Sequence, residues 1–464
     1  MTIMAGEPCP LSFNARTVRT AILVFKFILA AEVGMLPSAA VAASASSPRD
    51  SVHLGVASCA GSNCHGQYEY NTWSQETDPH RIDSHHRAYT VLLEDRAVRI
   101  ARNLGLADAV SADICLNCHA DNVPGDKRGP LFKLSDGVGC EACHGAAAGW
   151  LAVHLSGLGH KANLAAGLNP TEQPAARAKI CLACHLGRGG QELSHQIMGA
   201  GHPPLPFELD SSTAIEPAHF VVDKSYVQRK GFVSSIKTWA VGQAVEVAER
   251  MDAILDPKNV PHGIDPELVL FDCETCHHRT DRPRWSIRAS RGNGPGSLSL
   301  YDVSARLLQI VAAQVAPNEG ASLNPHVIAL SGAVSKDWAT VQREAQHLRS
   351  AADALIPELE RHSFTQRDMT ALADAIAVAA LSGEDTEYSF ARQATMALDA
   401  IVAAMRSAGY VTDDEMPEIN SGLDEAYRSL ADDQTYRPAT FERALEHLRQ
   451  SISPHLPEAY FTVH

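Results

Sequence analysis

The sequence predicts a mainly α-helical protein in two parts: a segment of short helices and long loops, followed by a C-terminal helical bundle. Two observations predict this division. Close cysteine pairs, each followed by histidine, occur between residues 59 and 277 among loops rich in Gly and Pro. Beyond residue 300 there is no cysteine, and apolar residues recur with helical spacing. We therefore expect a first region at 43–300 and a helical region at 301–464.

The composition is that of a globular chain of 464 residues, 45% hydrophobic and 20% charged. A formal net charge of −15, with only 39 Lys and Arg, argues against non-specific nucleic-acid binding. The unusual counts are 11 Cys and 22 His, because thiolate and imidazole are the common ligands of soft and borderline metals.

The C-terminal region is predicted from amphipathic periodicity. In the first candidate helix, Leu307, Ile310, Val311 and Val315 share one face. The candidates, separated by breaks at Gly332, Gly383, Gly409 and Pro438, are 303–315, 337–356, 366–381, 390–407 and 441–452, and an earlier helix is expected at 234–255. This bundle is interpreted either as a docking or oligomerisation module or as a lid that completes the core.

The N-terminus has the pattern of a secretory signal. Arg16 and Arg19 precede an apolar stretch at 20–36, and small residues follow at 40–45. Lys26 and Glu32 interrupt the apolar stretch, so a membrane anchor is the weaker alternative. The sequence predicts a signal peptide at 1–42 and export to the periplasm, which would remove Cys9 and leave ten cysteines.

Those ten cysteines form five pairs, each followed at once by a histidine. Four pairs have the spacing Cys-x-x-Cys-His, and the first pair has four residues between its cysteines. The sites are Cys59, Cys64 and His65; Cys115, Cys118 and His119; Cys140, Cys143 and His144; Cys181, Cys184 and His185; Cys273, Cys276 and His277. Cys-x-x-Cys-His is the attachment sequence of c-type haem, in which two thiols bond the porphyrin and the imidazole binds the iron. Gly61 and Ser62 permit a bulged turn in the widened first site.

Other uses of these cysteines fit less well. A zinc site needs four ligands and does not require a histidine after every pair. Disulfides that close such short loops stabilise little, and a thioredoxin-like pair would occur once. The sequence therefore predicts five covalently attached haem c groups within about 220 residues. That length of chain is too short to surround each haem with protein of its own, so we expect the haems to pack against one another.

Further residues recur around the first motifs in a fixed order: Cys64-His65, Trp73, the His85-His86-Arg87-Ala88 element, the block from Gly137 to Gly145, and His154. In this order the N-terminal region resembles the cytochrome c-554 family of multihaem electron carriers. The resemblance covers the first four sites, so the first region divides into a family-like part at 43–210 and a fifth-haem extension at 211–300. The widened first site, the fifth haem and the helical tail depart from the family.

The resemblance also implies distal iron ligands. It assigns His85 to the third haem, with His80 and His86 as close competitors, and His154 to the first haem, and it leaves the second haem five-coordinate. From the residues alone, His195 repeats the offset of His154 from the preceding site, so it is an alternative ligand for the second iron. We expect an open or weakly ligated second haem.

Further candidates lie beyond the family-like part. His195, His202 and His219 occupy loops near the fourth and fifth sites, where each is either a distal ligand or a solvated side chain. An arginine cluster follows the fifth site: Arg279, Arg282, Arg284, Arg288 and Arg291. These arginines could form ion pairs with haem propionates, bind an acidic partner, or simply make a solvated basic loop.

These observations predict a periplasmic pentahaem cytochrome c that transfers electrons between redox proteins. We expect its electron donor or acceptor to be a multihaem oxidoreductase or a membrane quinol enzyme. We expect no nucleic acid among its partners. One alternative is an enzyme that acts on a small nitrogen or sulfur compound at a five-coordinate haem, and another is a haem-wire subunit whose tail binds a quinol enzyme. Electron transfer is the preferred interpretation over catalysis.

Overall fold

Residues 51–230, called the haem-motif region below, contain the first four cysteine motifs. Their helices are short and are connected by long loops, as expected from the many Gly and Pro residues. The computed structural model describes residues 51–61, 64–65, 83–187, 193–259, 267–277, 298–382 and 387–452. In this region its α-helices are α1 (Asp95–Asn103), α2 (Asp113–His119), α3 (Cys140–His144), α4 (Ala147–Leu155), α5 (His160–Ala165), α6 (Pro174–Leu182), α7 (His195–Gly199), α8 (Leu209–Ile215) and α9 (Lys224–Lys230).

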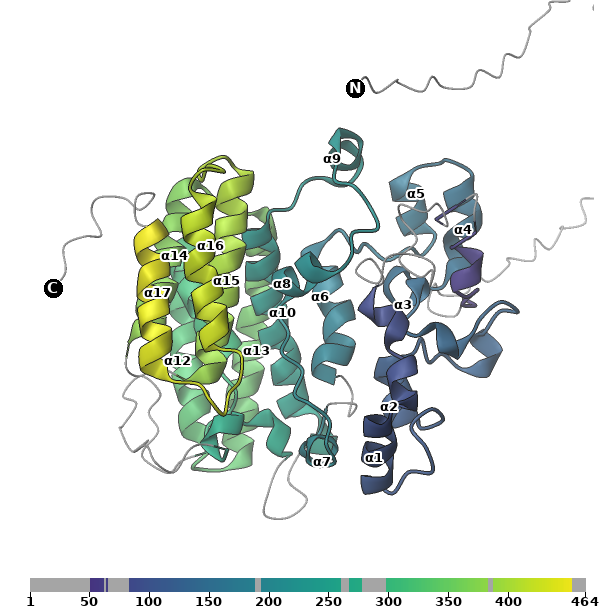
Figure 1. Cartoon of the computed structure of the whole chain (residues 1–464), viewed down its shortest axis with the longest axis horizontal. Coiled ribbons are helices and arrows are strands. Elements are labelled where there is room, and N and C mark those ends of the chain that lie inside the picture. Colours follow the sequence, from purple (N-terminus) through teal and green to yellow (C-terminus); the bar gives the residue numbers. More distant parts are fainter. Residues whose placement is uncertain are drawn as a thin grey trace, which may run out of the picture. The chain divides into compact units, whose positions relative to one another are not determined.

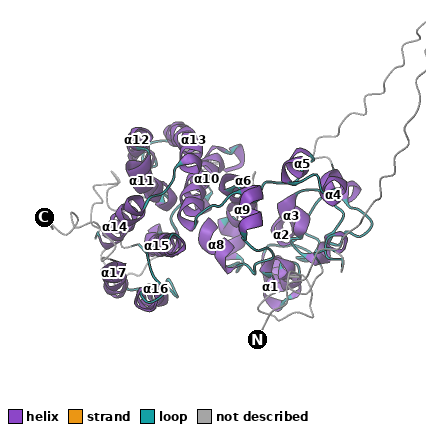
Figure 2. Cartoon of the chain, turned by 90° about the horizontal axis from the view of Figure 1, so that it is seen from above, coloured by secondary structure: helices purple, strands orange, loops and turns teal. Residues whose placement is uncertain are grey.

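The C-terminal helices are longer and pack side by side (Figure 1). They are α10 (Ser235–Leu255), α11 (Val303–Val315), α12 (Pro317–Ala333), α13 (Trp338–Arg361), α14 (Gln366–Leu381), α15 (Tyr388–Ser407), α16 (Met416–Ser429) and α17 (Pro438–Ile452). Figure 2 shows these helices nearly end-on. Among the described residues, extended pairing is limited to two isolated bridges, so the protein is mainly α-helical.

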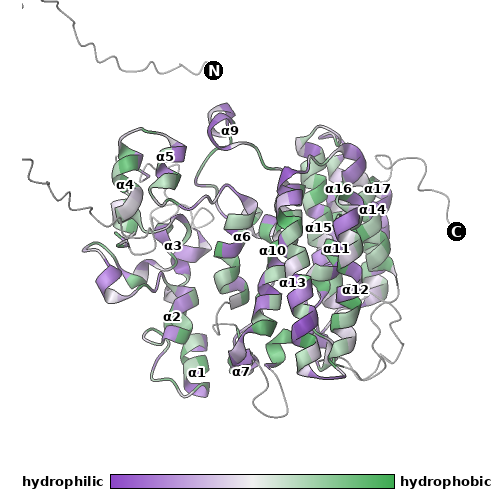
Figure 3. Ribbon diagram, turned by 180° about the vertical axis from the view of Figure 1, so that it is seen from behind, coloured by the Kyte–Doolittle hydropathy of each residue, from purple (hydrophilic) through white to green (hydrophobic). Residues whose placement is uncertain are grey.

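The bundle forms because each helix buries an apolar stripe. In α13, buried residues recur every three or four positions: Val341, Ala345, Leu348, Ala352, Leu355 and Leu359. Both polar and apolar positions are visible along these helices in Figure 3. Side-chain caps fix their starts: the Asp337 carboxylate accepts from the backbone N–H of Thr340, and Thr365 forms a capping box with Asp368.

Helix α10 lies inside this core although it precedes the fifth cysteine pair. It packs against α13, α11 and α15 and also against α6 and α8 of the haem-motif region. Buried side chains occur all around it, including Ile236, Trp239 and Val245. One apolar cluster therefore runs from Leu182 and Phe207 through α10 into the bundle.

Most of the predicted helices are confirmed, and two were missed. The ranges of α11 and α14 agree with the prediction, and α10, α13, α15 and α17 differ by a few residues at their ends. Helices α12 and α16 were not predicted, because Pro325 and Gly332 lie within α12 and Pro417 and Gly422 within α16. The expected breaks near Gly332 and Gly409 are both found, since α12 ends at Ala333 and Gly409 follows α15 with a positive φ of 76°.

Several sequence predictions lie outside the described residues. These are the signal peptide at 1–42, Trp73, His80, Gly383 and the arginine cluster at 279–291. Within the described part of the chain, no helix is both long enough and apolar enough to cross a membrane.

Candidate haem-binding site

Each cysteine motif is carried by a single turn of helix or by a tight loop. Helices α2 and α3 contain the second and third motifs, and the fourth spans the end of α6 and a π-helical turn at Ala183–Gly187. The fifth begins in a 3₁₀ turn at Cys273–Thr275. Positions three and four residues apart lie on the same side of a helical turn, so both thiols and the imidazole can face one macrocycle.

The widened first motif closes in the same way as an ordinary one. In the fifth motif, the backbone N–H of His277 donates to the carbonyl of Cys273 at 2.7 Å. In the first motif, the N–H of His65 donates to the carbonyl of Cys59 at 3.1 Å, and Cys64 bonds back to Gly61 at 2.8 Å. The same link between the first cysteine and the histidine therefore spans the two extra residues.

Each of the five motif histidines faces one other histidine across a nearly constant gap. The ring centroids are 6.2 Å apart for His65 and His154, His85 and His185, His119 and His202, and His144 and His219, and 6.1 Å apart for His195 and His277. Two metal–imidazole bonds of about 2 Å plus the distance from each nitrogen to its ring centre add up to about 6 Å. Each gap therefore has room for one iron atom between the rings.

The second ring nitrogen of several of these histidines is already occupied. Nδ1 of His119 lies 2.7 Å from the carbonyl oxygen of Ala88, and Nδ1 of His202 lies 2.7 Å from the carbonyl oxygen of Pro203. Nδ1 of His85 lies 3.0 Å from the Asp83 carboxylate. Such contacts orient metal-bound imidazoles and leave Nε2 as the free ligand atom. The donor set thus fits a metal held between paired imidazoles.

Burial keeps several of these rings in the neutral form that binds metal. Desolvation lowers the pKa of both His144 and His185 to about 4, and it also lowers the pKa of His154, His202 and His219. A neutral imidazole has a free lone pair at neutral pH, so no proton has to leave before the metal binds.

The histidines of the first four motifs and all of their cysteines except Cys140 line one large cavity of about 1710 Å³. An ordinary small-molecule pocket has about 300–1,000 Å³, so this cavity is larger than one ligand requires. All ten described cysteines are free thiols. The Cys59 thiol interacts with the Cys140 thiol and raises its pKa, and the Cys184 thiol raises the pKa of Cys118 in the same way. These contacts place the first motif beside the third and the second beside the fourth.

The observed histidine pairs differ in part from the expected ones. His154 lies opposite His65, as the resemblance implied. His85, expected opposite the third-motif His144, instead faces His185 of the fourth motif, while His219 faces His144. His86, a competitor of His85, belongs to none of the five pairs.

The second motif is also paired, contrary to the expectation of an open site. His202 faces His119, and His195, the alternative candidate, faces His277. Two tethers explain this arrangement. Asn103 in α1 donates to the carbonyl of Ala200, which brings the loop containing His202 to the second motif. The backbone N–H of His195 donates to the Glu267 carboxylate, which holds α7 near the fifth motif.

Sequence reasoning missed the residues that support these pairs. The buried Glu141 carboxylate accepts from the backbone N–H groups of Leu54, Gly55 and Ala147 at 2.6–2.8 Å, which ties the N-terminal segment to the third motif. Phe207 stacks on His185 with 4.7 Å between the ring centroids. The only signal for Glu141 was its place inside the third motif.

Gly137, at the start of the third-motif block, shows why that block contains glycine. It has a φ of 74°, and a Cβ at this position would overlap the carbonyl oxygen of His85. The next residue, Val138, donates its N–H to the same carbonyl at 3.1 Å. A glycine is required here because the His85 backbone packs directly against it.

Comparison with known proteins agrees with this geometry. Residues 58–145 match the family described as cytochrome c554 and c-prime. Searches of curated proteins and of solved structures found no match to the chain. The matched segment contains the first three motifs and His85. Residues 58–145 are thus similar to the cytochrome c554 and c-prime family, and this similarity supports a c-type cytochrome that transfers electrons.

Proposed function

We propose that this chain is a pentahaem cytochrome c that relays electrons between redox proteins in the periplasm. The observation that carries the proposal is the set of five histidine pairs, each joining a motif histidine to one other histidine at 6.1–6.2 Å. Five unrelated ring contacts would not share one separation, because aromatic pairs range over about 4.5–7 Å.

In this proposal every iron has two imidazole ligands. In motif order, the distal ligands are His154, His202, His219, His85 and His195. The haems supply the one-electron redox couples, and the chain supplies their axial ligands, burial and mutual placement. An iron with both axial positions filled has no site for a substrate, so the pairing favours a carrier over the oxidoreductase considered above.

The contacts between motifs indicate which haems would be neighbours. Haems one and three would be neighbours through Cys59 and Cys140, and haems two and four through Cys118 and Cys184. The fifth haem would be a neighbour of the second haem. Their distal ligands, His195 for the fifth and His202 for the second, belong to one short segment around α7. The fifth motif is also tied to the bundle, since Glu274 accepts from the backbone N–H of Tyr388 at 2.8 Å.

The ligand state of the irons tests this function. We expect the purified ferric protein to show only low-spin haem by electron paramagnetic resonance, and the ferrous protein to bind carbon monoxide slowly or not at all. A stoichiometric high-spin signal together with rapid carbon monoxide binding at one haem would instead support an enzyme with an open iron.

A further inference from the structure

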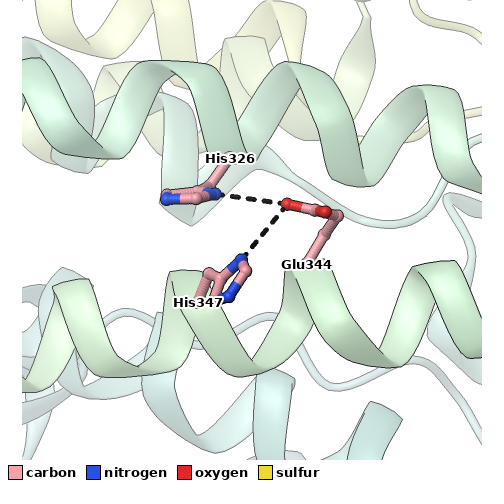
Figure 4. A group of neighbouring side chains, drawn as sticks. All are labelled: His326, Glu344 and His347. Atoms are coloured by element: carbon pink, nitrogen blue, oxygen red, sulfur yellow. Dashed lines mark hydrogen bonds and ion pairs between the residues drawn. The ribbon is translucent and has the colours of Figure 1, made fainter.

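A cluster of metal-ligating side chains lies in the helical bundle, away from the cysteine motifs. His326 of α12 meets Glu344 and His347 of α13, as Figure 4 shows. Glu344 and His347 are three residues apart, so both side chains project from the same face of α13. No part of the proposed electron-transfer function requires these residues.

We propose that His326, Glu344 and His347 form a zinc-binding site that links α12 to α13. One oxygen of Glu344, Oε2, lies 3.2 Å from Nδ1 of His326 and 3.5 Å from Nδ1 of His347. All three ligand atoms lie within 4.8 Å of one another. A tetrahedral site with bonds of about 2.0–2.1 Å has ligand atoms about 3.3 Å apart, so small side-chain rotations are enough to bind the ion.

The ligand types select the metal. Two imidazoles and one carboxylate suit zinc and similar transition metals, whereas calcium and magnesium prefer oxygen ligands alone. Nε of Arg343 lies 3.5 Å from the other Glu344 oxygen, Oε1, and so orients the carboxylate with Oε2 toward the histidines. Three protein ligands leave a fourth position for water.

The site is also accessible. The side chain of His347 is 50% exposed and that of His326 is 33% exposed, while Glu344 is 14% exposed. A second cluster with similar residue types, His53, Asp121 and Glu141, fits a metal less well. Its Glu141 carboxylate already accepts three backbone N–H groups, so few lone pairs remain for an ion.

Equilibrium dialysis of the haem-loaded full chain against zinc chloride, with bound zinc measured by elemental mass spectrometry, tests the proposal. We expect one zinc per chain at micromolar free zinc. His326→Ala, Glu344→Gln and His347→Ala should each weaken binding on the order of tenfold or more. Zinc should also raise the melting temperature of the wild type but not that of His347→Ala. Because the His347 side chain is half exposed, its replacement by alanine should leave the fold intact.

His447→Ala is the matched control. His447 lies between Glu418 and Glu425 at 3.0 and 3.2 Å, so it is a partly exposed histidine with carboxylate neighbours in a different helix pair. It should leave zinc binding unchanged. Absence of bound zinc in the wild type, full binding by His347→Ala, or an equal loss in His447→Ala would each overturn the proposal.

Discussion

Arg96 donates two hydrogen bonds to the carbonyl oxygen of Gly201, from Nε at 3.1 Å and from Nη2 at 2.9 Å. The two residues are 105 positions apart in the chain. Gly201 immediately precedes His202, the histidine that faces the second-motif His119. A surface arginine on α1 therefore helps to hold the proposed distal ligand of the second haem.

Arg96→Ala should loosen this ligand without removing it. An exposed hydrogen bond of this kind contributes about 1 kcal/mol, which corresponds to about a fivefold change in the population of the detached state. Carbon monoxide can bind only after the histidine leaves the iron, so its binding rate by the ferrous protein should rise about fivefold. The control is Arg99→Ala, an exposed residue of the same helix, and equal rates in both variants would contradict this role of Arg96.

Ferric haems of two spectroscopic types are expected in a ratio of three to two. The ring planes are nearly perpendicular in the His85–His185, His119–His202 and His144–His219 pairs, at 77–89°. They are closer to parallel in the His65–His154 and His195–His277 pairs, at 22° and 31°. The angle between axial imidazole planes sets the splitting of the iron d orbitals, so the two groups should have different g values.

Removing single ligands checks that assignment. His154→Ala should convert to high spin one haem whose two imidazole planes are near-parallel. His85→Ala should convert to high spin one haem whose two imidazole planes are nearly perpendicular. Both variants should also melt at a lower temperature, because metal ligation contributes folding free energy. Unchanged low-spin signals in both variants would show that these histidines are not ligands.

Cofactor number can be measured directly. Intact mass and the pyridine haemochrome assay should give five haems per chain for the wild type. The double variant Cys59→Ala, Cys64→Ala should lose one haem, because the widened loop holds both of its thioether bonds. Retention of five haems in that variant, or four in the wild type, would mean that the first site does not attach haem.

Gly422→Ala should destabilise the bundle although alanine is the better helix former. A Cβ at Gly422 in α16 would lie 2.8 Å from Cα of Leu448 in α17, so the two helices would have to separate. We expect a loss of about 1–3 kcal/mol, seen as a lower melting temperature. Gly332→Ala in α12 is the control, because a Cβ at that position would meet nothing within 4 Å beyond the adjacent backbone of its own helix. It should instead stabilise by up to about 1 kcal/mol.

Stability should fall as the pH rises through the range in which buried Glu208 ionises. Desolvation raises the pKa of Glu208 to about 7. Between its ordinary pKa near 4.5 and pH 7, the folded state holds a proton that the unfolded state has lost, so this contribution decreases with rising pH. The whole effect is at most about 3 kcal/mol.

Glu208→Gln cannot ionise, so its melting temperature should fall less between pH 5 and 7 than that of the wild type. The substitution keeps one of the two oxygens that accept from the backbone N–H groups of Asp210 and Ser211 at the start of α8, so one of these two hydrogen bonds is retained. Asp433→Asn, at an exposed position, controls for the change in net charge. Identical slopes for Glu208→Gln and the wild type would rule out Glu208 as the titrating group.

Local features were predictable from the sequence because their causes are local. Two thiols and an imidazole within five or seven residues are enough to predict haem attachment, which stays a prediction. The 3.6-residue period of apolar positions predicted α11 and α14 to the residue. The same local rules missed α12 and α16. There the apolar contacts of Leu323, Val327 and Leu423 outweigh the cost of internal Pro and Gly residues.

The partners of four of the five motif histidines were decided by the tertiary structure, whereas the pairing of His65 with His154 was implied by the family resemblance. A pool of candidate histidines could be identified from the sequence, and His85, His154, His195, His202 and His219 are the ones that face the motif histidines. Which one faces which depends on contacts between segments far apart in the chain, such as Arg96 with Gly201 and His195 with Glu267. Neither residue spacing nor repeated offsets contain that information, because a loop of many residues can close on any nearby site at almost the same entropic cost.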